Sequence, residues 1–444
     1  MIVMKFGGTS VGSSESIKEV VEIVSSDNRD KIVVLSAFSG VTNLLVRLNQ
    51  EYENGVDNIQ QTIQDLEVRC LEVVNPLFQT ATYLQVAQNY IALKVDEIKK
   101  LIENDFQLIN TKKIIAQGEI ISTNVFHLFL QEKSISCSLV SALDFMSLDV
   151  QGEPDLPLIS HQLIPIFNQK GKGLMVTQGF ICNDYKGTIT NLDRGGSDYT
   201  ASLIGAAVHA EEIQIWTDID GMHNNDPRYV ENTFSVEEVS FDEAAELAYF
   251  GAKILHPQSL IPAKNHSIPV LLKNTFSPEQ KGTIIKNSTT SKGVTSIAAK
   301  DGIIAIKIKS YRMLLAYGFL KKVFEIFETY KTPIDMITTS EVAVSLTIDR
   351  ADFLEEIVEK LQEFGAVEVD KELSIVCVAG DFSQNKGGLS AQVFNALQHI
   401  PIRMISYGGS NYNISLLVKT SHKVDALNSL NQQLFKERVL ANQV

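Results

Sequence analysis

The chain opens with IVMKFGGTS, residues 2–10, a short β-branched and apolar run that ends in two glycines. Such a run predicts a buried strand at Ile2–Phe6, and the glycines predict a turn directly after it. Ser14–Ser25 has helical spacing and begins beside small capping residues. A strand, a glycine turn and a helix in this order are typical of the first unit of a parallel sheet.

Short β-branched runs continue to alternate with longer amphipathic stretches over the first two thirds of the chain. Further buried strands are predicted at Lys31–Ser36, Lys113–Gln117, Ser138–Val140, Gly173–Thr177 and Glu212–Thr217. A helix is predicted at Tyr199–His209, and the long polar stretch Asn54–Asp105 predicts a helical hairpin or lid. This order indicates an α/β domain in which helices cover a mainly parallel sheet.

The composition changes near Lys281–Lys300, where Gly, Ser, Thr and Lys crowd together, so we expect a domain boundary there. Beyond it a shorter pattern occurs twice. The first copy has predicted elements at Ile303–Ile308, Gly318–Tyr330, Ile334–Thr338, Ala343–Ile348, Phe353–Phe364 and near Val367. The second has Leu373–Ala379, Leu389–Leu397, Ile402–Ser406, Asn413–Val418 and Lys423–Phe435. A tandem βαββα(β) order is typical of ferredoxin-like modules.

Composition and charge exclude several kinds of partner. The 444 residues suffice for two or three domains, and the net charge of -14 argues against nucleic acid or an anionic membrane as the main partner. No apolar run approaches the roughly 20 residues of a membrane helix, and no signal peptide is evident. The four cysteines, Cys70, Cys137, Cys182 and Cys377, lack metal or redox spacing. Reduced thiols in a cytoplasmic protein are therefore expected.

The first candidate for chemistry is Lys5-Phe6-Gly7-Gly8-Thr9-Ser10 at the end of the first predicted strand. Two glycines allow the backbone to approach a polyphosphate, and exposed N–H groups can then bind its oxygens. Lys5 offers a point charge and Ser10 a hydroxyl. The spacing matches neither a P-loop nor a dinucleotide-binding fingerprint. A glycine turn without special function remains the alternative.

Two further segments are weaker candidates. Leu35–Ala37 and Gly40–Asn43 place small and hydroxylated residues after a strand, where open α/β sheets bind ligands, although such residues are also ordinary helix caps. Glu119 follows the predicted strand Lys113–Gln117 and is a candidate for holding a substrate ammonium. A first-turn glutamate that complements a helix dipole is the alternative.

Asp193–Ala201, DRGGSDYTA, is a stronger candidate because an arginine precedes the glycines and acid that begin a helix. An arginine can clamp a carboxylate, and helix N-terminal amides favour anions. Asp218 ends a strand and is a candidate for ribose hydroxyls, and Arg228 and Lys253 are candidates for phosphates. Trp216 is expected in the core. We expect His223 and His256 to be structural hydrogen-bonding residues.

Taken together, these segments resemble the aspartokinases of the amino-acid kinase superfamily. Seven motifs occur in the family's order: KFGGTSV (Lys5–Val11), GVTN (Gly40–Asn43), GE (Gly118-Glu119), RGGSDYTA (Arg194–Ala201), IWTDIDG (Ile215–Gly221), DPR (Asp226–Arg228) and GAKILHP (Gly251–Pro257). ITTSE (Ile337–Glu341) and IRMISYGGSNYNI (Ile402–Ile414) are similar to the monofunctional, lysine-sensitive branch. No dinucleotide fingerprint follows, so a fused homoserine dehydrogenase is not expected.

The resemblance implies a fold and a set of site residues. The fold is a three-layer αβα amino-acid kinase (carbamate-kinase-like) domain at 1–298, followed by ferredoxin-like βαββαβ ACT domains at 299–371 and 372–444. ATP would be bound by Lys5, Gly7, Gly8, Ser10, Thr217, Asp218, His223, Arg228 and Lys253. Aspartate would be bound by Thr42, Glu119, Phe180, Arg194 and Ser197. Lys5 and Lys253 would act on the transferring group, and Asp198 would orient Lys5 or bind Mg²⁺ through water. No direct metal ligand is assigned.

The resemblance also implies regulation by an amino acid, with lysine expected. The effector residues would be Met313, Gly318, Phe319, Leu320, Asp335, Ser340 and Glu341. A homodimer through the ACT domains is expected, and a tetramer is left open. The alternative to regulation is that the tandem repeat serves only as a dimerisation platform. Two positions depart from the family. His223 stands where relatives often have a tyrosine near the adenosine, and Ala316 where lysine-sensitive relatives can have serine.

The implied reaction is the ATP- and Mg²⁺-dependent phosphorylation of L-aspartate to 4-phospho-L-aspartate, the first step in making lysine, threonine and methionine. A side-chain carboxylate with a pKa of about 3.9 is already ionised at neutral pH, so it needs no general base. Catalysis should then rest on charge neutralisation and positioning. The alternatives are a superfamily enzyme that acts on glutamate, N-acetylglutamate, carbamate or a nucleoside monophosphate, and a catalytically inactive amino-acid sensor.

Overall fold

The computed structural model describes residues 1–55, 58–103, 105–170, 173–192, 195–250, 255–289, 293–313, 317–382 and 388–436. The chain forms two compact units. The first comprises Met1–Met222, Glu237–Phe241 and Leu255–Ser288, and the second comprises His223–Val236, Asp242–Ile254 and Thr289–Val444. The predicted domain limits at 298 and 371 stay predictions. Among the helices in these ranges, none is long and apolar enough to span a bilayer.

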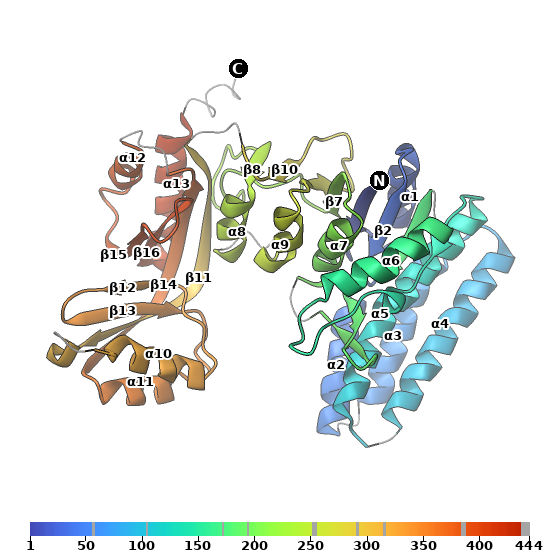
Figure 1. Ribbon diagram of the computed structural model, residues 1–444, viewed down its shortest axis with the longest axis horizontal. Coiled ribbons are helices and arrows are strands. Elements are labelled where there is room, and N and C mark those ends of the chain that lie inside the picture. Colours follow the sequence, from blue (N-terminus) through green and yellow to red (C-terminus); the bar gives the residue numbers. More distant parts are fainter. Residues whose placement is uncertain are drawn as a thin grey trace. The chain divides into compact units, whose positions relative to one another are not determined.

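An eight-stranded sheet forms the centre of the first unit, in the order β3-β4-β2-β1-β7-β9-β10-β8 (Figure 1). The strands are β1 (Ile2–Phe6), β2 (Lys31–Leu35), β3 (Ser138–Leu139), β4 (Leu174–Gln178), β7 (Glu212–Thr217), β8 (Glu238–Ser240), β9 (Val270–Asn274) and β10 (Thr283–Lys286). All neighbours are parallel except β9 and β10. Five of the six predicted strands are confirmed to within one residue at each end.

Helices cover both faces of this sheet (Figure 1). On one face, Ile2, Met4 and Phe6 of β1 share a buried core with α1 (Ser14–Ser26), α2 (Val41–Asn54), α3 (Ile59–Val74), α4 (Ala81–Ile102) and α5 (Leu108–Glu132). On the other face, α7 (Gly196–Ala207) contacts β1, β2 and β7 and packs beside α6 (Leu156–Lys170) and α9 (Pro257–Asn265). The hairpin predicted within Asn54–Asp105 is confirmed as α3 and α4, which pack against one another.

The prediction of a strand at Lys113–Gln117 was wrong, because these residues lie inside the 25-residue helix α5. A short apolar run such as this one does not distinguish a strand from a buried helix segment. Gly118 lies in the middle of the same helix. A Cβ added there would lie 3.0 Å from Ala37 Cβ and 3.1 Å from Leu45 Cδ1, so the glycine allows α5 to approach its neighbours closely. Glu119 therefore projects from a helix and not from a strand end.

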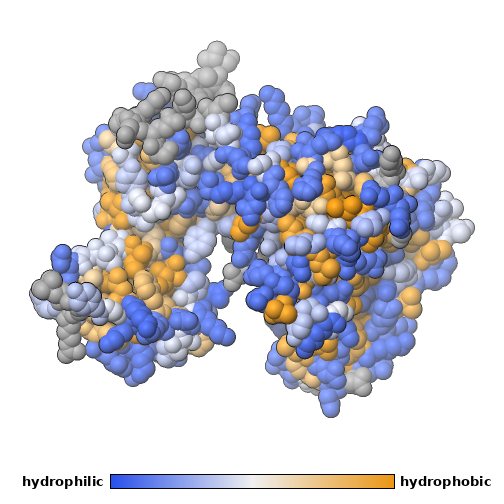
Figure 2. All heavy atoms as spheres, viewed as in Figure 1, coloured by the Kyte–Doolittle hydropathy of each residue, from blue (hydrophilic) through white to orange (hydrophobic). Residues whose placement is uncertain are grey.

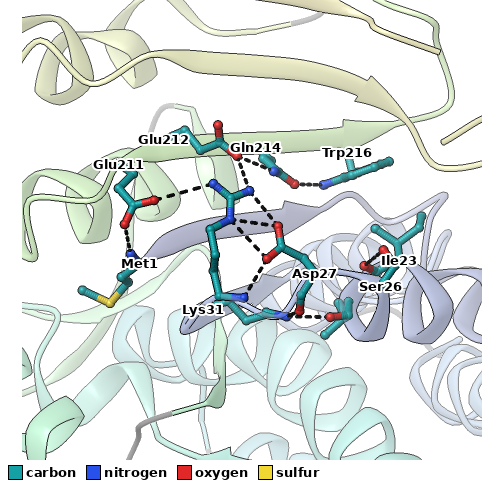
Figure 3. A network of polar contacts seen from close by, with 11 residues as sticks. Met1, Ile23, Ser26, Asp27, Lys31, Glu211, Glu212, Gln214 and Trp216 are labelled. Carbon is teal, nitrogen blue, oxygen red and sulfur yellow. Dashed lines mark hydrogen bonds and ion pairs between the residues drawn. The ribbon is translucent and has the colours of Figure 1, made fainter. Parts of the chain in front are cut away.

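A chain of polar contacts links the start of β7 to Arg29, which precedes β2 (Figure 3). Arg29 Nη2 donates to Glu212 Oε1 at 2.8 Å, and Gln214 Nε2 donates to the same oxygen at 2.7 Å. Trp216 Nε1 in turn donates to Gln214 Oε1 at 3.0 Å. The indole is 4% exposed and stacks on Phe6, which confirms its predicted place in the core. The carboxyl ends of β1 and β7 are thereby held side by side.

A six-stranded antiparallel sheet forms the centre of the second unit, in the order β12-β13-β11-β14-β16-β15. The strands are β11 (Val294–Lys309), β12 (Ile337–Thr339), β13 (Ala343–Ile348), β14 (Ala366–Gly380), β15 (Ile402–Tyr407) and β16 (Asn413–Lys419). The helices are α8 (Phe241–Tyr249, of which all but Phe241 belongs to this unit), α10 (Phe319–Thr329), α11 (Leu354–Gln362), α12 (Leu389–Ala396) and α13 (Lys423–Leu434). Both predicted βαββα copies are present.

The two modules share their longest strands, which the sequence pattern did not predict. β11 pairs with β14 along nearly its whole length. The first module uses 303–309 of β11 and 366–370 of β14, and the second uses 294–300 of β11 and 373–380 of β14. The predicted limit at 298 thus falls inside β11. The second module thus takes one of its four strands, 294–300 of β11, from a part of the chain that comes before the first module.

The segment His223–Val236 packs on α13 within the second unit. Asn224 Nδ2 donates to Asn431 Oδ1 at 2.8 Å, and Asn225 Nδ2 donates to the carbonyl of Leu427 at 3.1 Å. A predicted part of the nucleotide site therefore rests on a helix of the second ACT-like module.

Hydrophobic residues gather on the visible surface over the strands of the ACT-like modules (Figure 2). Ile337 of β12 is 37% exposed, and Ile405 and Tyr407 of β15 are 41% and 51% exposed. The two edge strands lie side by side, since Thr338 Oγ1 donates to the carbonyl of Ile405 at 3.3 Å. An apolar surface of this kind is typical of a protein–protein contact.

Candidate active site

Lys5 lies near the carboxyl end of β1 and forms an ion pair with α7. Its Nζ is 2.6 Å from Asp198 Oδ1, and the two side chains are 11% and 17% exposed. A Cβ added at Gly7 would lie 3.5 Å from Lys5 Nζ, so the glycine leaves that side of the ammonium accessible. The N–H of Gly7 itself donates to the carbonyl of Trp216 at 3.2 Å. The predicted catalytic residues Lys5 and Asp198 are thus adjacent.

The loop after β2 packs directly against the glycine loop. A Cβ added at Gly8 would lie 3.1 Å from the carbonyl oxygen of Ala37, and one added at Gly12 would lie 2.8 Å from Ser39 Cβ. Only glycine permits so close an approach. The loop ends at Gly40, whose φ of 85° is left-handed, and α2 begins at the next residue. The predicted substrate residue Thr42 is half-buried in the first turn of that helix.

Glu119 is a buried carboxyl group beside this loop. Its side chain is 4% exposed, and Oε1 accepts the N–H of Ala37 at 3.3 Å. Oε2 is buried and has no partner among the described residues. Burial raises the pKa of Glu119 to about 7, against the smaller opposing effect of the Ala37 hydrogen bond. A buried acid with one unpaired oxygen is suited to bind a ligand cation.

The start of α7 is joined to the ends of β2 and β4. Ser36 Oγ donates to Ser197 Oγ at 2.9 Å, and a Cβ added at Gly179 would lie only 2.3 Å from that Ser197 oxygen. Phe180 adopts a left-handed φ of 67°, and its N–H donates to Thr200 Oγ1 at 2.8 Å. The structure thus brings Phe180 and Ser197 to the end of the sheet at which Lys5 lies.

Ser10 is fully buried, and its hydroxyl already has a protein partner. Ser10 Oγ lies 2.7 Å from Thr275 Oγ1, and the N–H of Thr275 donates to the carbonyl of Thr217 at 2.8 Å. Thr217 Oγ1 donates to Asp218 Oδ1 at 3.1 Å, and Asp218 is exposed. These contacts link the glycine loop to the end of β7. A direct bond from Ser10 to a phosphate stays a prediction.

Two predicted nucleotide residues lie in the second unit. His223 is half-buried, with Nδ1 3.3 Å from Thr233 Oγ1. Arg228 is exposed and pairs with its neighbour Asp226, Nη2 to Oδ2 at 2.6 Å. The hydrogen bonds and charge of Asp226 raise the pKa of Arg228. Arg194, Lys253 and Ala316 lie outside the described residues.

The predicted effector residues lie around the first ACT-like module. Phe319 and Met313 belong to or pack on its apolar core, while Gly318, Leu320, Ser340 and Glu341 are exposed. Asp335 differs, because its side chain is 2% exposed and Oδ1 accepts hydrogen bonds from Lys300 Nζ at 2.9 Å and the Tyr249 hydroxyl at 2.8 Å. Asp335 Oδ2 is buried without a partner among the described residues.

Sequence reasoning missed Thr275 and Thr200, which hold Ser10 and Phe180. Thr275 directly follows β9, and residues at the carboxyl ends of parallel strands gather at one edge of the sheet. The position of Thr275 directly after a strand was therefore the sequence feature that could have identified it as a site residue. Thr200 stands inside the predicted RGGSDYTA motif, but no sequence pattern indicates that its hydroxyl accepts a backbone N–H.

Residues 1–274 match the Amino acid kinase family, and residues 376–434 match the ACT domain. With the Lys5–Asp198 pair at the carboxyl edge of a parallel sheet, this match defines an amino-acid kinase joined to ACT modules. Lysine-sensitive aspartokinase 3 of Escherichia coli (strain K12) is 33% identical over 98% of this chain and 99% of its own length. Chloroplastic aspartokinase 3 of Arabidopsis thaliana is 35% identical over 96% of this chain and 81% of its own. The chain belongs to the aspartokinase family, which confirms the resemblance.

Solved structures of relatives agree with this assignment. The crystal structure of E. coli aspartokinase III in complex with aspartate and ADP (R-state) has a TM-score of 0.84 at 33% identity, covering 98% of this chain and 100% of that one. The complex of the same enzyme with lysine and aspartate (T-state) has a TM-score of 0.83 at 34% identity, covering 98% and 99%. The predicted three-layer domain with tandem ACT modules is thus confirmed.

Proposed function

We propose that this chain transfers the γ-phosphoryl group of ATP to the side-chain carboxylate of L-aspartate, forming 4-phospho-L-aspartate, and that lysine inhibits it at the ACT modules. The product would enter the synthesis of lysine, threonine and methionine. The main support within the chain is the pairing of Lys5 with Asp198, together with the buried Glu119 beside the loop after β2, which has one oxygen unpaired among the described residues. A cation for phosphates and an anion for an ammonium then stand at one end of the sheet.

Aspartate would be bound through both of its charged ends. Glu119 Oε2 would accept the α-ammonium, because this buried oxygen has no other partner among the described residues. Ser197 at the start of α7 would donate to a substrate carboxylate, where the helix dipole favours an anion. Arg194, three residues earlier in the sequence, would complete the carboxylate clamp. Thr42 and Phe180 would line the same pocket.

Phosphoryl transfer would proceed without a general base. One oxygen of the substrate's side-chain carboxylate attacks the γ-phosphorus, and the bond from that phosphorus to the β,γ-bridging oxygen breaks, so that ADP leaves. Lys5, held by Asp198, would neutralise the transferring group, and Lys253 would supply a second positive charge to it. Gly8 and its neighbours permit a close backbone approach, while Thr217, Asp218, His223 and Arg228 would contact the nucleotide.

The reaction would also need Mg²⁺, which neutralises charge on the ATP phosphates when it is bound with them. Carboxylate oxygen is the donor that Mg²⁺ prefers, and Asp198 is the acid beside Lys5. Among the described residues, no three His, Cys, Asp or Glu side chains gather as a metal site. Mg²⁺ would therefore be held by the phosphates and by Asp198, directly or through water.

Inhibition and assembly would both involve the ACT modules. Asp335, with one buried oxygen unpaired among the described residues, would accept a hydrogen bond from an effector ammonium. The other predicted effector residues, Met313, Gly318, Phe319, Leu320, Ser340 and Glu341, would complete that site. The exposed apolar residues Ile337, Ile405 and Tyr407 support a homodimer through these modules. The four cysteines, all within the described residues, form no disulfide, as expected in the reducing cytoplasm.

A coupled assay for ADP formation tests this function and its regulation together. With ATP and Mg²⁺, aspartate should stimulate ADP formation, while glutamate, N-acetylglutamate and buffer alone should not. Lysine, threonine and methionine are then titrated separately, and lysine should inhibit. If none of these acceptors stimulated ADP formation, the catalytically inactive amino-acid sensor would be the better interpretation. If activity responded to none of the three amino acids, the ACT modules would serve only in dimerisation.

A further inference from the structure

We propose that Arg69, on hairpin helix α3, is a positioning residue for phosphoryl transfer, because it ties together the two loops that form the site. The inference rests on the proposed function and extends it to a helix that the sequence motifs leave unassigned. Arg69 acts through the backbone of the glycine loop and of the loop after β2, whose carbonyls it binds.

The contacts of Arg69 join these two loops from one side chain. Its Nη2 donates to the carbonyl of Gly12 at 2.6 Å, and its Nε donates to the carbonyl of Ser39 at 2.9 Å. Gly12 lies near the end of the glycine loop, and Ser39 lies near the end of the loop after β2. The side chain of Arg69 is 25% exposed, and both hydrogen bonds are partly buried. The remaining nitrogen, Nη1, faces Glu72 Oε2 at 3.4 Å on the exposed side.

The two loops have almost no free space between them, so the hydrogen bonds of Arg69 restrain both loops together. A Cβ at Gly12 would lie 2.8 Å from Ser39 Cβ, and a Cβ at Gly8 would lie 3.1 Å from the Ala37 carbonyl. The glycine loop follows Lys5, and the N–H of Ala37 holds Glu119. A shift of either loop therefore changes the separation between the cation for the phosphates and the acid for the substrate ammonium.

Arginine is suited to this task for a geometric reason. Its planar guanidinium presents several N–H groups in fixed directions, so two carbonyls can be bound at once. Fixing the Ser39 carbonyl also fixes the peptide that joins Ser39 to Gly40. Because that peptide is trans, the N–H of Gly40 points away from Arg69. A lysine ammonium is a point charge on a flexible stem and does not impose the same orientation.

Steady-state kinetics of Arg69→Ala, Arg69→Lys and Glu72→Gln test the proposal in the full-length protein. We expect Arg69→Ala to lower kcat about tenfold to a hundredfold, since misplacement by about 1 Å can cost that much, with smaller changes in the KM for ATP and aspartate. Arg69→Lys should recover little of the loss. Glu72→Gln removes the exposed ion pair but leaves both carbonyl bonds, so its kcat should match the wild type.

A second readout separates positioning from a general loss of stability. Methylguanidinium at millimolar concentration should restore part of the activity of Arg69→Ala and none of that of Lys5→Ala. If folded Arg69→Ala retained kcat within twofold of the wild type, or lost activity only in proportion to its unfolded fraction, the proposal would be overturned. The proposed function is judged separately, from the wild-type rate with aspartate.

Discussion

Lys300 Nζ lies 2.9 Å from Asp335 Oδ1 and 2.9 Å from Asp349 Oδ2, so the carboxylate proposed for an effector ammonium already holds an ammonium of its own chain. The Tyr249 ring completes the enclosure, with its centroid 4.7 Å from Lys300 Nζ. Burial alone would lower the pKa of Lys300, but hydrogen bonds to the two aspartates outweigh it and raise that pKa. An effector ammonium that binds Asp335 would compete with this internal one.

Lys300→Met tests this competition. Removal of the internal ammonium leaves two carboxylates that attract a cation more strongly, so lysine should half-inhibit at a several-fold lower concentration. The measurement is activity at saturating ATP and aspartate against lysine concentration. Lys307→Met is the matched control, because Lys307 also lies on β11 but pairs with Glu368 at 3.2 Å. An unchanged or higher half-inhibiting concentration in Lys300→Met would contradict the competition.

The pKa of Glu119 predicts a pH-dependent substrate affinity. Burial raises this pKa to about 7, so the carboxyl is largely protonated below that pH and ionised above it. Only the ionised form attracts an ammonium strongly. The KM for aspartate should therefore rise as the pH falls from 8 to 6 in the wild type. In Glu119→Gln the KM should be high and nearly independent of pH over this range. A flat profile in the wild type would argue against the assigned role.

The raised pKa of Glu119 also predicts that the free energy of unfolding of the ligand-free protein falls as the pH rises, whereas aspartate affinity increases. The unfolded state loses the Glu119 proton near pH 4.5, whereas the ligand-free folded state keeps it until about pH 7. Stability therefore falls as the pH rises through this window. Relative to Glu119→Gln, the wild type should lose about 2 to 3 kcal/mol of unfolding free energy between pH 5 and pH 8. Urea titrations at both pH values measure this difference, and saturating aspartate should reduce it.

The Lys5–Asp198 pair predicts a separation between kcat and KM. Lys5→Ala should lower kcat by about a hundredfold or more, with a much smaller rise in the aspartate KM, because the charge acts on the transferring group. Asp198→Asn retains the cation but not its orientation, so a smaller loss of kcat is expected. Steady-state kinetics of both variants measure the effect. If Lys5→Ala stayed within a few-fold of the wild type, Lys5 would have no catalytic role.

The close approach of Gly179 to Ser197 makes this glycine sensitive to any side chain. In Gly179→Ala the new methyl group would lie 2.3 Å from Ser197 Oγ and 2.9 Å from Ser197 Cα, so the first turn of α7 must move. We expect a raised KM for aspartate and a lower thermal midpoint. Gly409→Ala is the control, since an added Cβ there meets nothing within 4 Å. If the two variants had the same KM for aspartate and the same thermal midpoint, the close packing of Gly179 on Ser197 would be refuted.

Much of the site was predictable because its residues follow strands. Lys5 lies one residue before the end of β1 and Thr217 ends the neighbouring parallel strand β7, and the carboxyl ends of such strands meet at one edge of the sheet. Glu119 was identified by residue type and motif, but its element was assigned wrongly because KIIAQ suits a strand as well as a buried helix turn. The residue nevertheless reaches the same edge, from α5.

Other features had no signal in the sequence. Arg69 binds backbone carbonyls, which no residue pattern encodes, and an arginine on a helix is usually solvated. Lys300 and Asp335 meet through packing of the second unit, although 35 positions separate them in the chain. The sharing of β11 between two modules was also hidden, because each half of the strand has an ordinary alternating pattern. Tertiary packing decides all three.

The most direct test of the central claim is the identity of the acyl phosphate that the protein makes. The wild-type chain is incubated with ATP, Mg²⁺, hydroxylamine and either aspartate or glutamate, and hydroxamates are measured by mass spectrometry, with Lys5→Ala as the matched control. We expect aspartyl-β-hydroxamate from the wild type with aspartate, none from glutamate, and a strongly reduced yield from Lys5→Ala. No hydroxamate from aspartate, or an equal yield from glutamate, would contradict an aspartate-specific kinase.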